Sequence, residues 1–172
     1  MDRTEIAILS KQTALSTDFL AEIGRITAHF ALLERDLMDL THRLLRLPEK
    51  SARAVTSELS FRAMQNLAAS LVKELHPNSA ESFKEILKLV GKCEEKRNQI
   101  SHSLWGAGLN KIGDEKTVIR TKYSAKQQRG LVLQREEMTL NDLQLIAAEI
   151  SVAAYEVEGF HADIFREGGK NG

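Results

Sequence analysis

The chain has 172 residues, of which 42% are hydrophobic, and its 24 Lys and Arg residues balance its 24 Asp and Glu residues. This size and composition suit one domain with a buried core. The absence of a basic surplus argues against a wide nucleic-acid-binding surface. The single cysteine, Cys93, excludes an internal disulfide and a cysteine-based zinc site.

No apolar stretch approaches the ~18 residues that a membrane span needs. Asp2, Arg3 and Glu5 interrupt the start of the chain, so we expect no signal peptide. The histidines have no metal-ligand spacing with Asp, Glu or Cys, and no phosphate-binding loop or dinucleotide fingerprint occurs. We therefore expect a cytoplasmic protein without cofactor, metal or membrane association.

Helical periodicity dominates the chain. Apolar residues recur every three or four positions from Phe19 to Leu44, which predicts a helix over residues 16–47 that ends at Pro48. Similar patterns predict further helices, with Ser60 and Thr139 as N-caps. The predicted helices cover residues 16–47, 50–59, 61–75, 79–104 and 139–165.

Residues 106–136 differ from the rest, because glycines and β-branched residues replace the helical pattern. Gly113-Asp114 and residues 127–130 read as turns between two or three short antiparallel strands. We therefore predict a mainly α fold: an up-and-down helical bundle with a small β-hairpin excursion. Residues 16–166 form its single domain, between an N-terminal segment, 1–15, and a flexible tail, 167–172.

A charged residue interrupts the apolar face of the predicted helix over residues 79–104. At about 100° per residue, Arg97 falls in the middle of a stripe formed by Phe83, Ile86, Val90, Cys93 and Leu104. Arginine is almost never fully buried unless it is paired. Glu34 lies on the apolar stripe of the first helix, so we predict that it pairs with Arg97, with Glu94 as second candidate.

Two more polar residues follow Arg97 on the same predicted helix. Asn98 and His102 are i, i+4 neighbours, so their side chains can share a hydrogen bond. Arginine supplies a planar donor fork suited to phosphate, and histidine transfers protons near neutral pH. A purely structural Glu34–Arg97 pair between packed helices is the competing interpretation.

The stretch Arg97-Asn98-Gln99-Ile100-Ser101-His102 resembles the R-N-x-x-x-H signature of HEPN domains. Phe30 to Leu37 is similar to the F-x-x-x-E-x-x-L stretch of that family's first long helix. The resemblance implies a HEPN-like bundle that forms a homodimer, in which two copies of the motif face each other. It further implies a metal-independent endoribonuclease of the toxin–antitoxin or defence type, with an antitoxin or other protein as a possible partner.

Carried over by position, the resemblance makes His102 the general acid or base and Arg97 the ligand of the scissile phosphate, with Asn98 assisting both. Glu34, Ser101 and Trp105 are supporting positions. Trp105 either closes the end of the bundle or stacks on a base. Other family members are inactive, so the alternative is a dimeric binding module for a protein partner or a nucleotide.

Overall fold

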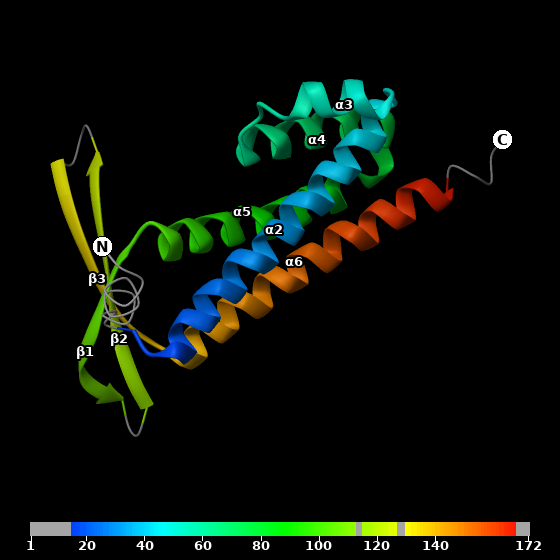
Figure 1. Cartoon of the computed structure of the whole chain (residues 1–172). Helices are drawn as coiled ribbons and strands as arrows, with labels where there is room; N and C mark the ends of the chain where they lie inside the picture. The colour runs from blue at the N-terminus through cyan, green and yellow to red at the C-terminus, as the bar shows by residue number, and fades with distance from the viewer. Residues whose placement is uncertain (1–14, 113–114, 127–129, 168–172) are drawn as a thin grey trace, which may run out of the picture. The chain divides into compact units, whose positions relative to one another are not determined.

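The computed structural model describes residues 15–112, 115–126 and 130–167 (Figure 1). The chain divides into two compact units. We call them the helical unit, Ile26–Arg97 with Ile146–Gly172, and the sheet unit, Met1–Arg25 with Asn98–Leu145. The observed helices are α2 (Thr17–Leu45), α3 (Glu49–Thr56), α4 (Phe61–Leu75), α5 (Ala80–Ser101) and α6 (Leu140–Glu167), with a 3-10 turn, η1, at Pro77–Ser79.

The helical unit is a bundle whose core follows the predicted apolar stripe of α2. From Ile26 onward, the buried side chains of this stripe are Phe30, Leu33, Leu37, Leu40 and Leu44. Aromatic contacts join the neighbouring helices. The ring of Phe30 packs edge to face on that of Phe61 in α4, with 4.9 Å between the ring centroids. The ring of Phe83 in α5 stacks on that of Phe160 in α6, with 4.6 Å between the centroids. The predicted bundle is therefore confirmed within this unit (Figure 1).

Local signals fix several helix ends, two of them as predicted. Helix α4 begins after Ser60, whose hydroxyl accepts a hydrogen bond from the amide of Ala63. Helix α6 begins after Thr139, where Thr139 and Asp142 cap each other's backbone amides. Helix α2 ends at Leu45, slightly earlier than predicted, because Arg46 adopts a left-handed φ of 53° that stops the helix.

The sheet unit contains three antiparallel strands in the order β1-β2-β3: β1 (Leu104–Ile112), β2 (Glu115–Lys126) and β3 (Gly130–Thr139). These strands extend beyond the predicted 106–136 at both ends. The predicted turn at Gly113-Asp114 and most of the second turn, residues 127–129, lie outside the described residues.

The predicted end of the helix that carries Arg97 is wrong, and the predicted helix over 50–59 is observed as α3, Glu49–Thr56. Helix α5 ends at Ser101 rather than at residue 104, and Leu104 is the first residue of β1, where its partner is Thr121. The side chain predicted to join the buried stripe is therefore 66% exposed. Pairing with β2 decides this boundary, because Leu104 joins the β1–β2 ladder instead of continuing the helix.

Candidate functional site

In the helical unit, α5 places Arg97 against α2. Its Nη2 donates a hydrogen bond to Oε1 of Glu34 at 3.2 Å, so the predicted ion pair is confirmed. The guanidinium carbon lies 4.0 Å from the ring centroid of Phe30, within cation–π distance. The Arg97 side chain is 22% exposed. Glu34 and Phe30 thus both contact the guanidinium, and part of the Arg97 side chain remains exposed to solvent.

One donor of this guanidinium remains without a partner. The Nε of Arg97 is buried and makes no hydrogen bond among the described residues. A buried, unpaired donor costs free energy unless a ligand or water satisfies it. The second predicted partner, Glu94, is engaged elsewhere, because it accepts a hydrogen bond from Gln65 of α4 at 3.0 Å.

The pKa of Glu34 reflects this pairing and its partial burial. Partial burial raises the pKa of its carboxyl group above the ordinary value, Arg97 lowers it, and the nearby charge of Glu94 raises it again. The net direction is upward. The pair therefore combines the attraction of Arg97 with the desolvation of Glu34, and desolvation is the larger influence on the Glu34 pKa.

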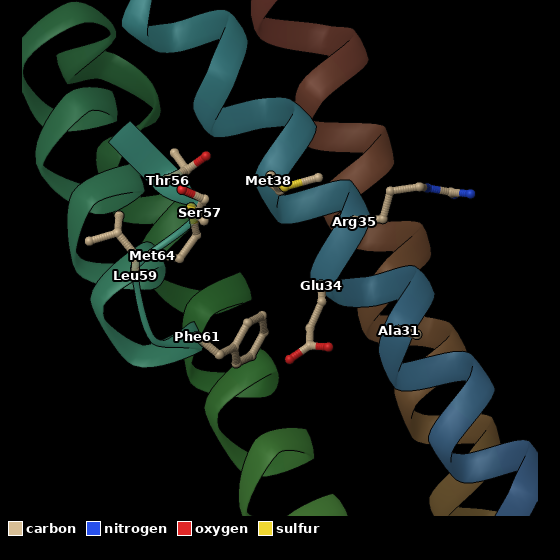
Figure 2. Close-up of a pocket in the computed structure, with 9 residues that line it drawn as sticks. All are labelled: Ala31, Glu34, Arg35, Met38, Thr56, Ser57, Leu59, Phe61 and Met64. Carbon is tan, nitrogen blue, oxygen red and sulfur yellow. The ribbon is translucent and has the colours of Figure 1, made fainter. Parts of the chain in front are cut away.

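A cavity of about 370 Å³ opens beside Glu34, between α2 and the α3–α4 segment. Figure 2 shows the Glu34 carboxylate and the Phe61 ring on this cavity, whereas Arg35 extends away from it. The other lining residues are Ala31, Met38, Thr56, Ser57, Leu59 and Met64. Its volume and mixed lining fall within the range of small-molecule sites.

In the sheet unit, the chain leaves α5 through a tightly hydrogen-bonded turn. The amide of His102 donates to the carbonyl of Asn98 at 3.2 Å, and the indole Nε1 of Trp105 donates to the carbonyl of Ile100 at 3.2 Å. The hydroxyl of Ser103 donates to the carbonyl of Gln99. Three of the last helical carbonyls are therefore satisfied by the residues that follow. Trp105 lies in β1 and supports this turn, and Ser101, the last residue of α5, is exposed.

This turn presents His102 to solvent. All five histidines of the chain are described, and His102 is exposed whereas His29, His42, His76 and His161 are partly buried. His29 and His42 hydrogen-bond to Ser151 and Thr56, respectively. Of the five, His102 is thus the most accessible for proton transfer to a ligand.

A second arginine, Arg120 of β2, was not predicted. Its Nη1 donates to Ser103 Oγ at 3.3 Å, and its Nε donates to Glu136 Oε2 of β3 at 3.2 Å. Its side chain is only 6% exposed. Because Ser103 is adjacent to His102, Arg120 helps to fix the backbone that carries the histidine. Arg97 was predicted because it interrupts the apolar stripe of a helix. Arg120 lies in a strand, where no such stripe exists, so the sequence pattern did not indicate that it is buried.

Among the described residues, no three His, Cys, Asp or Glu side chains gather closely enough to hold a metal ion. No helix in this part of the chain has the length and hydropathy of a membrane span. No protein-family model matches the chain, and no curated protein or solved structure is significantly similar to it.

Proposed function

We propose that this protein is a metal-independent endoribonuclease whose site combines Arg97, Asn98 and His102 from two copies of the chain. The observation that carries the proposal is the exposure of His102, alone among the five histidines, five residues after an arginine that Glu34 and Phe30 hold in place. A solvent-accessible histidine can exchange protons with a substrate. An oriented guanidinium can stabilise developing phosphate charge.

The proposed reaction is an internal transesterification of RNA. His102 accepts the proton of a ribose 2′-hydroxyl, whose oxygen attacks the adjacent phosphorus. The bond between phosphorus and the 5′-oxygen then breaks, and that oxygen takes a proton from the second His102 or from water. The products are a 2′,3′-cyclic phosphate and a 5′-hydroxyl. Arg97 neutralises the phosphate charge and Asn98 orients the groups around it.

The test is cleavage of a labelled single-stranded RNA by the wild type and by His102→Ala, both with a chelator present. A positioned acid–base histidine contributes about 10²–10⁴-fold, so we expect a loss of that size. His29→Gln is the matched control, because it removes a partly buried histidine and should leave cleavage unchanged. Equal activity in wild type and His102→Ala would indicate a contaminant and refute the proposal.

A second candidate function is a catalytically silent, dimeric binding module for a nucleotide or a protein partner. The cavity beside Glu34 favours it, because its volume and lining suit a small ligand. This candidate predicts no cleavage by the wild type, together with a melting temperature that a nucleotide raises. Ala31→Phe, which narrows the cavity, should abolish that shift.

A further inference from the structure

A second groove lies on the helical unit, between α4 and α5, with a volume of about 560 Å³. It is separate from the cavity beside Glu34, since the two share no lining residue. The side chains that line it are mainly basic or amide-bearing: Arg62, Gln65, Asn66, Lys84, Lys88, Lys92 and Glu95, with Leu87 and Gly91.

The charge of this groove contrasts with the rest of the chain. Four cationic side chains and one carboxylate line it, in a protein whose formal net charge is zero. Lys84, Lys88 and Lys92 are four residues apart on α5, so they repeat along one helix face at a rise of about 6 Å. Arg62 approaches from α4. The result is a row of positive charges about 12 Å long, which suits an extended polyanion better than a single phosphate group.

Two of these lysines already have acidic neighbours, but the pairs are weak. Lys84 contacts Glu81 at 2.9 Å and Lys88 contacts Glu85 at 2.6 Å, and all four side chains are more than half exposed. Exposed pairs of this kind contribute little and exchange readily. A phosphate can therefore replace either glutamate. Lys92 of the same row makes no ion pair among the described residues.

Gly91 lies at the centre of the groove, where the Arg62 side chain of α4 approaches α5. A β-carbon at this position would lie 3.6 Å from Nη1 of Arg62 and 4.0 Å from Oε1 of Gln65. Glycine weakens a helix interior, and the structure shows no backbone strain at Gly91 that would require it. Both distances are ordinary van der Waals contacts, so Arg62 packs directly against α5 at this point. Gln65, which is almost fully buried and tied to Glu94, anchors this wall of the groove.

We propose that the α4–α5 groove binds the backbone phosphates of single-stranded RNA through Lys84, Lys88, Lys92 and Arg62. The inference rests on the proposed function in one respect, namely that the bound strand is also the strand to be cleaved. Regularly spaced cations match a chain with one charge per nucleotide. Asn66 and Leu87 offer an amide and an apolar surface to the bases. An acidic protein segment is the competing ligand, which the test below separates from RNA.

The test measures fluorescence anisotropy of a labelled single-stranded RNA with chelator present, in a His102→Ala background so that cleavage plays no part. Replacing Lys84, Lys88 and Lys92 together by Ala should weaken binding on the order of 10-fold or more. The slope of log affinity against log salt should fall by about 0.7 for each lost phosphate contact. Circular dichroism checks that this variant remains folded.

Three further variants sharpen the test. Gly91→Asp places an anion in the groove and should weaken binding, by less than the triple substitution because all four cations remain. Replacing Glu81 and Glu85 by Gln should strengthen binding, because the phosphates no longer compete with carboxylates. The control replaces Lys50 of α3 and Lys73 of α4 by Ala. Both lysines lie outside the groove, so this variant should bind RNA as tightly as the His102→Ala protein does.

Competitors identify the ligand class. Inorganic polyphosphate should displace the RNA, whereas polyglutamate at equal charge should not. Equal displacement by polyglutamate, unchanged binding by the triple variant, or equal weakening in the control would each overturn the proposal. The assay is independent of cleavage. An inactive wild type whose RNA binding depends on these lysines would refute only the nuclease, whereas an active wild type with lysine-independent binding would refute only the groove.

Discussion

The helical unit and the sheet unit each withdraw an arginine from solvent and pair it with a glutamate, yet the two pairs differ. Arg97 is 22% exposed, lies on the ring of Phe30 and leaves its Nε unsatisfied. Arg120 is 6% exposed and uses its Nε, Nη1 and Nη2 in hydrogen bonds with Glu136 and Ser103. Because the unsatisfied Nε of Arg97 is itself buried, it is the greater exposure of the Arg97 side chain that distinguishes it from Arg120 as a group that a ligand can reach.

The largest expected loss of stability concerns the pair Arg120–Glu136 in the sheet unit. Glu136→Ala removes the main partner of a buried charge, so it should lower the free energy of unfolding by about 3 kcal/mol. Fluorescence of Trp105, the single tryptophan of the chain, reports on this unit during denaturant unfolding. Glu137→Ala, the adjacent exposed position of β3, is the matched control, with an expected change below about 0.5 kcal/mol. Similar losses in both variants would show that the Arg120 pair has no special role.

The next largest expected loss of stability concerns the pair Arg97–Glu34 in the helical unit. Arg97→Ala removes the guanidinium from Phe30 and leaves Glu34 without its partner, at an expected cost of about 2 kcal/mol. Thermal unfolding followed by circular dichroism measures it. Arg35→Ala, which removes an exposed arginine one residue from Glu34, should leave the melting temperature unchanged. An unchanged melting temperature for Arg97→Ala would contradict the burial described here.

Sequence periodicity found one of these arginines and missed the other for a physical reason. On an amphipathic helix, a charged residue stands out within a stripe of apolar residues. The pairing of Arg97 with Glu34 could therefore be predicted from the sequence. In β2, Thr117, Val118 and Arg120 are all buried, so strand alternation does not separate the core from the surface. Arg120 therefore resembled a solvated residue.

Helix boundaries could likewise be predicted only where neighbouring residues determine them. Ser60 and Thr139 were predicted as caps because capping depends on a few adjacent residues. The end of α5 was placed three residues too late, because it depends on pairing between Leu104 and Thr121, which are distant in sequence. Sequence likewise could not predict that Phe30 supports the guanidinium, or that α4 and α5 enclose a basic groove.

A smaller effect concerns Cys93, which lies on the same helix as Arg97. Burial raises the pKa of its thiol to about 11, from an ordinary 9.0. Because the folded state holds this proton more tightly, the contribution of Cys93 to stability should be lost as pH rises from 9 to 11. Comparing wild type with Cys93→Ser over this range isolates that contribution, since other groups titrate in both. A thiol reagent that modifies the native protein rapidly at neutral pH would contradict the burial of this helix face.

The smallest expected change in stability is that of His102→Ala. The side chain is exposed, and its described hydrogen bond uses the backbone amide, so the free energy of unfolding should change by less than about 0.5 kcal/mol. Denaturant unfolding of the purified variant measures it. A larger loss would mean that His102 has a structural role, and that reduced cleavage in this variant does not report on chemistry.

The central claim, that the incompletely engaged Arg97 serves RNA cleavage, is tested most directly by Arg97→Lys. Lysine keeps the positive charge and can still reach Glu34, but it lacks the planar donor fork. The cleavage rate per folded molecule, measured with chelator on a labelled single-stranded RNA, should fall on the order of 10²-fold while the melting temperature changes little. A variant that cleaves at the wild-type rate would show that Arg97 only joins α5 to α2.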